Sequence, residues 1–421
     1  MVKRFVIAII CCIACGMHAQ DGTVSPYSFF GIGELRSTTS VENQMMGGLS
    51  MYADSIHINL RNPAAYGKLK LTTYSIGVSH REIRLKSFTE QQNTSVTNLD
   101  YLSIGFPLGK GFGMGFGLMP LSSVGYNVLT ETVDQNQDSV RSVFAGEGGL
   151  NRVYLSIGYE LSKNLRLGAT TNLNFGTLEN RIIQTVDNVQ FGTSDRRESR
   201  VNGLDFNFAA NYTPTVKDKY TLYTSVTVNT QANLTSKNTQ QIGSFLVDTG
   251  LDVEVIDVNL DAQNLRNTEL KIPTTTTFGL GFGEDKKWFL GGEYSFQGLS
   301  SFTNDFISID NLTYEDASSF AFGGYFIPDY STFSGYFKRI TYRAGVRYEQ
   351  TGMMINDKEI NNFGITFGLG LPLGGSFSNI NLGFELGRRG TTAADLIEES
   401  YFNVNIGLSL NDRWFQKRKI N

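Results

Sequence analysis

The chain has 421 residues, with 36 Lys and Arg against 40 Asp and Glu and a formal net charge of −4. Its basic residues form no cluster except near the C-terminus, which argues against a nucleic-acid-binding protein. With 45 glycines, 12% aromatic residues and only 8 prolines, the composition is unusual for a soluble globular protein.

The first residues have the pattern of a secretory signal peptide. Lys3 and Arg4 precede an apolar run from Phe5 to Ala14, and small residues come after it. The run is too short for a membrane-spanning helix, which needs about 20 residues. We therefore predict that residues 1–20 are a leader that is removed on export.

The three cysteines, Cys11, Cys12 and Cys15, all lie in this leader. The mature chain therefore has no thiol for a disulfide, an iron–sulfur cluster or nucleophilic catalysis. Lipid attachment at Cys15 is the alternative to simple cleavage, and it is disfavoured because Cys12 stands where the attachment motif has leucine.

Residues 21–68 show no period-two alternation of apolar and polar side chains. The segment is too long for a simple tail and contains adjacent phenylalanines, adjacent methionines and an Asn-Pro pair. We predict that it forms a small compact unit, distinct from the rest of the chain. A disordered leader is the alternative.

Alternation begins after this segment and is clearest in GKGFGMGFGLMPLSSVGY (109–126). Large apolar residues from Phe112 to Leu118 share one face of a strand, and glycines occupy the other. The glycines do not form a phosphate-binding loop, because Lys110 is followed by Gly111 and Phe116 replaces the third glycine of the dinucleotide motif. This stretch is therefore a β-strand.

The same alternation recurs along the chain and predicts an all-β protein. Fourteen stretches show it: 73–78, 102–106, 111–118, 153–159, 165–175, 203–212, 222–228, 278–282, 288–296, 320–326, 342–348, 363–371, 380–386 and 402–410.

Short and long connections alternate between these strands. PLGKG (107–111) and ELSKN (160–164) are short, and the longest polar segment runs from about residue 229 to 271. This pattern is typical of outer-membrane barrels, and an even strand count puts both termini at the short-turn end. We predict that residues 69–410 form a fourteen-stranded antiparallel transmembrane β-barrel in the outer membrane of a Gram-negative bacterium, with both termini periplasmic.

Charged residues follow the same alternation. A charge that faces lipid at mid-membrane costs about 2–4 kcal/mol, so charges should point into a polar lumen. A soluble β-sandwich would also keep charge out of its core; it is disfavoured by the signal peptide, the loop pattern and the aromatic content. The charged residues on the face opposite the apolar one are Glu160, Arg166, Asp205, Glu293, Arg343, Arg347 and Glu385.

The stretch GGLSMYADSIHINLRNPAAY (47–66) resembles the N-terminal hatch of the FadL family of outer-membrane transporters. Members of that family carry a Gly/Ala-rich stretch, an Ala-Asp pair and then Asn-Pro-Ala before the first strand. The resemblance implies that residues 21–68 form a hatch that plugs the barrel. The matching residues are Gly47, Gly48, Ala53, Asp54, Asn62, Pro63 and Ala64.

The resemblance also implies a lateral exit, because in that family hydrophobic molecules leave sideways through a kink in the third strand. Pro120, with Gly125 after it, lies in the third predicted strand, and proline removes a hydrogen bond from the strand ladder. We predict a lateral gap at these two residues. The predicted lumen face is polar, however, since it carries Asn172, Asn174 and Asn207. It therefore differs from the apolar conduit that a transporter of hydrophobic molecules would need.

The sequence predicts no enzyme, no metal site and no cofactor. The mature chain has only His57 and His80, which are distant in sequence, and His80 falls on the lipid-facing parity. The acidic loop DTGLDVEVIDVNLD (248–261) lacks the fixed ligand spacing of a cation site. In the basic tail, 411–421, an aromatic pair is predicted to anchor at the membrane interface, with a periplasmic contact as the alternative.

Three functions remain open. The first is a FadL-like transporter that takes up hydrophobic small molecules through the lumen and the lateral gap. The second is an accessory or structural barrel subunit of an outer-membrane protein assembly or secretion complex. A general porin is disfavoured because the N-terminal segment would block it. The expected partners are outer-membrane lipid and either a hydrophobic ligand or other subunits, and not nucleic acid.

Overall fold

The computed structural model describes residues 22–135, 137–307, 311–332, 335–373 and 377–413. The predicted signal peptide, residues 1–20, and the aromatic pair Trp414–Phe415 lie outside the described residues. Among the described residues, no helix is long and apolar enough to cross a membrane.

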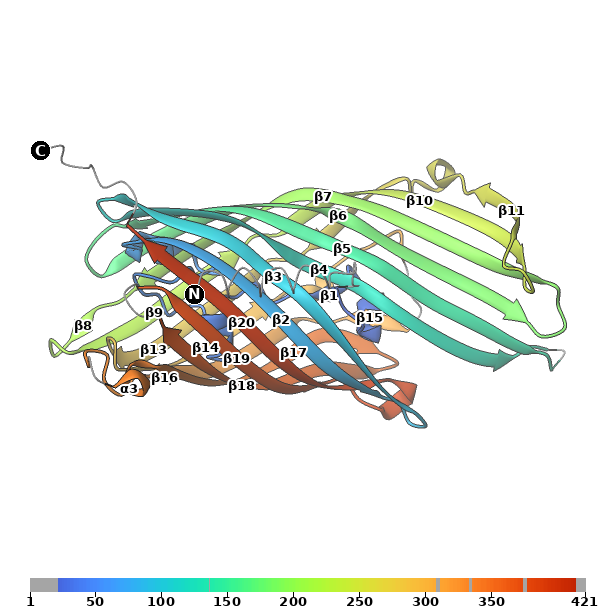
Figure 1. The fold of residues 1–421 in the computed structure, drawn as a ribbon. Helices are drawn as coiled ribbons and strands as arrows, with labels where there is room; N and C mark the ends of the chain where they lie inside the picture. The colour runs from blue at the N-terminus through green and yellow to red at the C-terminus, as the bar shows by residue number, and fades with distance from the viewer. Residues whose placement is uncertain (1–21, 136, 308–310, 333–334, 374–376, 414–421) are drawn as a thin grey trace, which may run out of the picture.

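The wall of the molecule is one antiparallel sheet that closes on itself (Figure 1). Each wall strand pairs with the next, and the last strand pairs with the first from Thr72–Asp412 to Lys86–Glu398. The predicted fold, a fourteen-stranded barrel with a small N-terminal plug, is confirmed.

The fourteen wall strands are built from sixteen assigned segments, because β9 and β10 are two parts of one strand, as are β12 and β13. The segments are β2 (Thr72–Lys86), β3 (Gln91–Gly109), β4 (Phe112–Val133), β5 (Ser139–Glu160), β6 (Leu165–Val186), β7 (Phe191–Tyr212), β9 (Tyr220–Asn229), β10 (Ala232–Leu246), β12 (Asn267–Ile272), β13 (Thr275–Glu284), β14 (Trp288–Gln297), β16 (Ala317–Phe326), β17 (Thr341–Ile355), β18 (Lys358–Pro372), β19 (Asn379–Arg389) and β20 (Glu398–Asp412).

Shorter elements lie inside the barrel and at its ends. They are η1 (Pro26–Phe29), β1 (Glu34–Leu35), α2 (Val41–Gln44), η2 (Pro63–Lys68), β8 (Thr215–Val216), β11 (Asp252–Asp257), η3 (Leu260–Gln263), η4 (Leu299–Ser301), β15 (Leu312–Tyr314), α3 (Tyr336–Arg339) and η5 (Ala393–Asp395).

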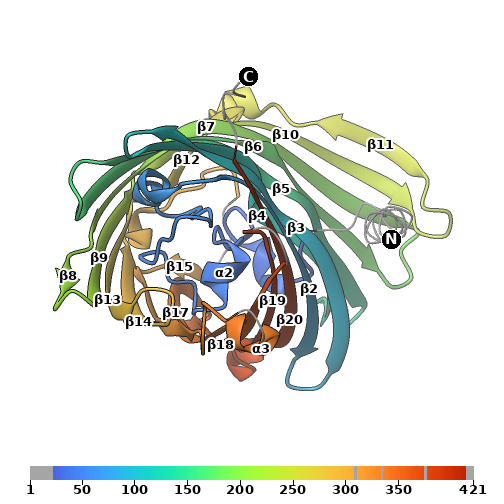
Figure 2. The ribbon, with the colours of Figure 1, turned by 60° about the vertical axis from the view of Figure 1, so that its left-hand side comes forward.

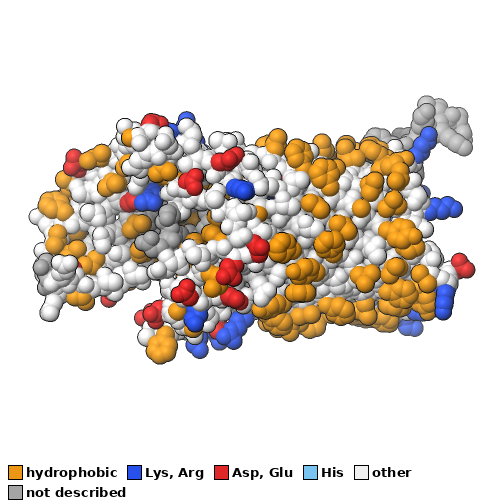
Figure 3. Space-filling view, turned by 180° about the vertical axis from the view of Figure 1, so that it is seen from behind, with side chains coloured by type: hydrophobic (Ala, Val, Ile, Leu, Met, Phe, Trp, Pro, Cys, Tyr) orange, Lys and Arg blue, Asp and Glu red, His pale blue; other side chains and the backbone are white. Residues whose placement is uncertain are grey.

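The alternation in the sequence becomes the two faces of the wall. Outward side chains such as Leu280, Phe322 and Phe367 are more than half exposed, whereas the inward Asp205 and Glu385 are buried. Figure 3 shows the outward hydrophobic side chains as a band around one half of the molecule, with charged side chains beyond it. This band is the surface that lipid would cover, because it excludes charge.

The wall is much taller on one side than on the other. β4, β5, β6 and β7 each have 22 residues, whereas β14 and β16 each have 10. At about 3.3 Å per residue, the long strands extend well beyond the apolar band. We call the end where β2 begins and β20 ends the short-turn end, and the opposite end the long-strand end (Figure 1).

The expected long loop from about residue 229 to 271 is largely sheet, which corrects the prediction. It contains β10, β11, η3 and β12, and β10 pairs with β7 from Thr235–Asn202 to Leu246–Phe191. Beyond the apolar band both faces of a strand can be polar, so the sequence loses the alternation that indicates a strand.

Candidate functional site

The N-terminal segment that precedes β2 fills the barrel. Figure 2 shows it in blue at the centre of the ring of strands, with α2 in the middle. Val41, Met45, Met46, Leu49 and Met51 are each at most 1% exposed. The segment is therefore a packed plug and not a loosely threaded chain.

Inward-facing glycines mark places where the plug touches the wall. A Cβ on Gly113 would lie 1.9 Å from the carbonyl oxygen of Tyr66, and a Cβ on Gly168 would lie 2.2 Å from the carbonyl carbon of Pro63. Side chains cannot approach backbone so closely, so glycine is required for this contact. The glycine ladder at the start of β4 is thus a docking surface for the plug.

Buried hydrogen bonds hold the plug to the wall. Glu293 in β14 accepts hydrogen bonds from the backbone N–H groups of Ser50 and Met51, each at 2.6 Å. Asn62 Nδ2 donates to Oδ1 of Asn211 in β7 at 2.9 Å. A buried polar group that loses its partner costs about 1–3 kcal/mol, so these contacts resist displacement of the plug.

The predicted hatch motif lies within the plug. Gly47 and Gly48 have φ of 76° and 88°, a left-handed conformation that favours glycine, and the N–H of Gly47 donates to Thr366 Oγ1 in β18 at 3.1 Å. Ala53 and Ala64 are buried.

The Asn-Pro pair of the motif lies where the plug meets the wall. Asn62 precedes η2 and is fully buried. Pro63 is the first residue of η2, where its missing N–H leaves no donor unsatisfied. η2 then leads into β2, so the motif ends at the point where the chain joins the barrel.

Asp54 forms an ion pair with His57 inside the plug. Asp54 Oδ2 lies 2.5 Å from His57 Nδ1, and Asp54 also accepts hydrogen bonds from two backbone N–H groups. Burial lowers the pKa of His57, but the charges of Asp54 and Glu42 and the hydrogen bond to Asp54 raise the pKa above its usual value. Burial raises the pKa of Asp54, but His57 and the hydrogen bonds leave the pKa well below its usual value.

The wall has a seam between β3 and β4. The two strands pair only from the short-turn end up to Leu102–Leu118. Each strand then carries one extra residue, Asp100 opposite β2 and Leu121 opposite β5, and a bulge of this kind bends its strand. Beyond that point, β3 follows β2 and β4 follows β5.

The plug fills this seam with its own short strand. β1 pairs with β4 at Ser122 and Ser123, and the N–H of Arg36 donates to the Leu121 carbonyl at 3.0 Å. The guanidinium of Arg36 then reaches Asp100 of β3 at 3.2 Å. Leu35, on the opposite face of β1 from the lumen, is 55% exposed. The plug thereby contacts both strands of the seam, β3 and β4.

The residues of the predicted lateral gap lie at this seam. Pro120 pairs with Asn151 of β5 immediately before the extra residue of β4. The N–H of Gly125 donates to Ser28 Oγ of the plug at 3.1 Å. Gly125 thus contacts the plug and Pro120 lies next to the bulge at the seam, while the existence of a gap that opens stays a prediction.

A buried charged group anchors β1 from the lumen side. Glu34 forms ion pairs with Arg81 of β2 at 2.8 Å and with Arg389 of β19 at 3.6 Å. Burial raises the pKa of Glu34, but Arg81, Arg389 and Arg36 together lower the pKa to about 2. The carboxylate is therefore charged throughout the physiological range.

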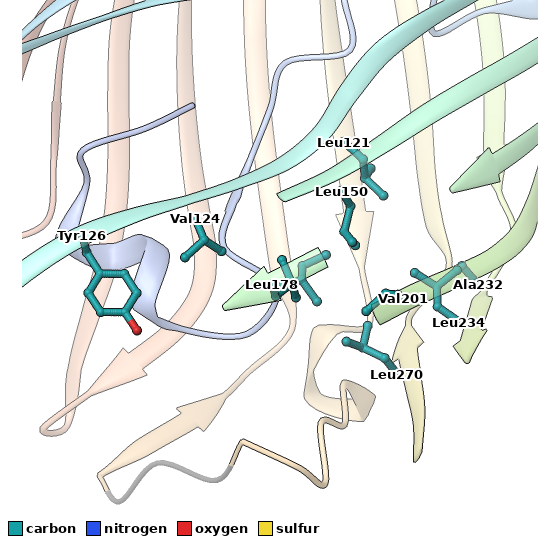
Figure 4. Packing of buried hydrophobic residues seen from close by; sticks show 10 residues of the cluster. Leu121, Val124, Tyr126, Leu150, Leu178, Val201, Ala232, Leu234 and Leu270 are labelled. Carbon is teal, nitrogen blue, oxygen red and sulfur yellow. The ribbon is translucent and has the colours of Figure 1, made fainter. Parts of the chain in front are cut away.

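An apolar cluster in the lumen lies next to the seam (Figure 4). The polar lumen predicted from the sequence is confirmed for Asn172, Asn174 and Asn207, which are buried. Towards the long-strand end, however, the inward face becomes apolar, a feature that was not predicted from the sequence. The cluster comprises Ile32 of the plug with Leu121, Val124, Tyr126, Leu150, Leu178, Val201, Ala232, Leu234 and Leu270 of the wall.

The alternation contained a signal for this cluster. Leu150 and Leu178 fall on the same parity as Arg152 and Asn174, which face the lumen. Apolar residues on the lumen parity of adjacent long strands predict an apolar patch inside the barrel. The bridge from Arg36 to Asp100 had no comparable signal, because the plug has no periodicity.

The histidines and the acidic residues were the candidates for metal chemistry in the described part of the chain. There, no group of three or more His, Cys, Asp or Glu could hold a metal ion. His80 is exposed on β2, and its Nδ1 lies 2.8 Å from Thr97 Oγ1.

Comparison with known proteins gives a family and a fold. The BamG family model matches residues 1–421. No curated protein sequence matches the chain.

Solved structures share the barrel. The Pseudomonas putida toluene transporter TodX is similar with 15% identity and a TM-score of 0.59, over 91% of this chain and 100% of TodX. A Pseudomonas aeruginosa FadL homologue is similar with 13% identity and a TM-score of 0.57, over 91% and 100%. The CymD monoaromatic hydrocarbon channel is similar with 12% identity and a TM-score of 0.56, over 91% and 99%. At this level of identity the likeness establishes a FadL-like fold.

Proposed function

The chain belongs to the BamG family, and from that premise and the plugged lumen we propose that it is an accessory barrel subunit of an outer-membrane protein assembly or secretion complex. In this role the barrel is a stable support in the outer membrane and carries out no enzymatic reaction. The observation that carries the proposal is the attachment of the plug, because a conduit needs a plug that yields.

The attachment is strong for a structural reason. The plug contacts opposite sides of the wall, with Gly168 and Asn211 at one side and Glu293 and Thr366 at another. Displacing it would break several buried hydrogen bonds together, each about 1–3 kcal/mol when one partner is left unsatisfied. A support subunit benefits from this rigidity, whereas a transporter must overcome it.

Purification of the tagged protein from detergent-solubilised outer membranes tests this function. We expect a fixed set of partner proteins to co-purify and to remain through size-exclusion chromatography. A tagged barrel of similar size from the same membranes serves as the control for nonspecific association. Recovery of the chain alone, in a detergent that preserves other outer-membrane complexes, would contradict the proposal.

We further propose that the short-turn end faces the periplasm and the long-strand end faces the cell surface. Short periplasmic turns and tall surface extensions are the usual asymmetry of such barrels. Protease added to intact cells should cut within residues 230–271 and spare residues 160–164. Cleavage at 160–164 in sealed cells would reverse the orientation.

Uptake of hydrophobic molecules is the second candidate function, and the apolar cluster beside the seam favours it. Leu121 belongs to both the cluster and the seam, so a small apolar molecule leaving the cluster would meet the bridge made by β1. FadL-like folds include a toluene transporter, which makes toluene a reasonable probe.

A proline replacement separates the two functions. Pro120→Val gives the strand an additional N–H donor, and it should lower toluene uptake into cells if the seam opens there. Pro107→Val, at the short-turn part of β3, is the matched control. Unchanged uptake in Pro120→Val with normal amounts of assembled barrel would argue against transport through the seam.

A further inference from the structure

The hairpin of β10 and β11 leaves an open sheet edge at the long-strand end (Figure 1). Within the described residues, β11 pairs only with β10, from Gln241–Asp257 to Phe245–Asp252. All six residues of β11 are exposed. An edge strand with exposed faces is a template for another strand, and proteins normally cover or shorten such edges.

The free backbone groups on this edge can be identified. The N–H of Val258 donates to the Gln240 carbonyl at 2.9 Å, and the Glu254 carbonyl faces Gly243. Hydrogen-bonding direction alternates along an antiparallel strand. The N–H and carbonyl groups of Val255 therefore point away from β10, towards the open side.

The side chains of the edge combine apolar and acidic character. Val253, Val255 and Ile256 are each more than half exposed. Residues 238–265 carry five acidic side chains and no basic one. This charge opposes pairing of β11 with a second copy of itself, because like charges placed across strands are destabilising.

Two of the acidic side chains are available to a partner. Asp252 and Glu254 form no ion pair or side-chain hydrogen bond with other described residues, whereas Asp257 accepts a hydrogen bond from Gln241 and Asp261 pairs with Arg266. The edge thus offers backbone groups, exposed valines and unpaired carboxylates in one short strand.

We propose that β11 binds an extended, basic segment of a partner protein, which adds to the sheet as a further strand. Backbone hydrogen bonds to the edge would give affinity, and alternating apolar and basic side chains would give selectivity. This inference rests on the proposed accessory function and names the surface through which a partner is held.

A peptide-binding experiment tests the edge alone. The purified barrel in detergent is titrated with a short peptide in which lysine alternates with valine, and with a second peptide in which glutamate replaces lysine. We expect the lysine peptide to bind and the glutamate peptide to bind at least about tenfold more weakly. Equal affinity for the two peptides, or binding of neither, would overturn the proposal.

Two variants locate the binding. Val255→Pro removes an open-side donor without breaking a bond to β10, and should weaken binding of the lysine peptide by about tenfold or more, the equivalent of one net hydrogen bond. Val255→Thr keeps the donor and is the control. Asp252→Asn with Glu254→Gln should weaken the same peptide by about threefold or more and reduce its salt dependence.

Co-purification distinguishes failure of the edge from failure of the function. Loss of a partner with Val255→Pro, but not with Val255→Thr, supports the proposal, provided that both variants keep the heat-modifiable migration of a folded barrel. An unchanged partner set with Val255→Pro overturns the edge proposal and leaves the accessory function standing. If no partner co-purifies with the wild-type protein, the proposed accessory function itself is contradicted.

Discussion

Glu293 provides the sharpest test of how the plug is held. Its carboxylate lies on the lumen face of β14, is 6% exposed, and accepts the N–H groups of Ser50 and Met51 at 2.6 Å each and the Ser50 hydroxyl at 3.0 Å. Glu293→Ala removes the acceptor of all three donors while the strand ladder of the wall stays intact.

The free-energy cost of Glu293→Ala depends on the hydrogen-bond donors that lose their acceptor. Two buried backbone N–H groups without an acceptor cost about 1–3 kcal/mol each, or about 2–6 kcal/mol together. Even the lower figure corresponds to roughly a 30-fold loss in the equilibrium constant for plug docking. Water that enters the vacated space would accept hydrogen bonds from some of these N–H groups, so we expect a cost in the lower part of the range.

Conductance and proteolysis measure this loss. In planar bilayers, Glu293→Ala should show openings that wild type lacks, and protease should cut residues 22–68 faster in detergent. Glu293→Gln keeps an acceptor oxygen and should lie between the two. Glu284→Ala, which removes ion pairs with Lys219 and Lys287 at the short-turn end, is the control. If Glu293→Ala shows no more channel openings than wild type and residues 22–68 are cut no faster, the carboxylate does not hold the plug.

Three further predictions concern the same plug. Deletion of residues 24–60 should leave an assembled barrel that leaks small polar solutes in a liposome-swelling assay, because the exposed wall is polar and rich in glycine; a sealed barrel would contradict this. Gly168→Ala should weaken plug docking by about 1–3 kcal/mol through overpacking against Pro63, measured by thermal unfolding, whereas Gly292→Ala on the outer face, with its nearest contact at 3.5 Å, should be neutral. The ion pair of Asp54 and His57 should make plug protection depend on pH. The raised pKa of His57 gives stability that is complete below about pH 6.5 and is lost as the pH rises through the folded-state pKa, while the lowered pKa of Asp54 gives stability that is lost only on acidification below about pH 4. The hydrogen-exchange protection factors of the plug, which are corrected for the intrinsic pH dependence of exchange, should therefore fall as the pH rises above about 6.5, and His57→Gln should remove that fall.

The sequence by itself determined the wall of the barrel. All fourteen stretches with period-two alternation are strands, and the charges of Arg166, Asp205 and Glu293 face inward as their parity predicts. The reason is local: lipid on one face and a polar lumen on the other impose a repeat of two residues on every strand. Counting the alternating stretches along the sequence also placed Pro120 correctly in the third wall strand.

Only the tertiary structure decided how the plug and the wall meet. The contact of Gly168 with Pro63 and the bridge from Arg36 to Asp100 join segments that are distant in sequence, and the plug has no repeat from which a partner could be inferred. The edge at β11 and the height of the long strands were hidden for a different reason. Beyond the apolar band both faces of a strand can be polar, so a continuous alternation no longer distinguishes a paired strand from a loop.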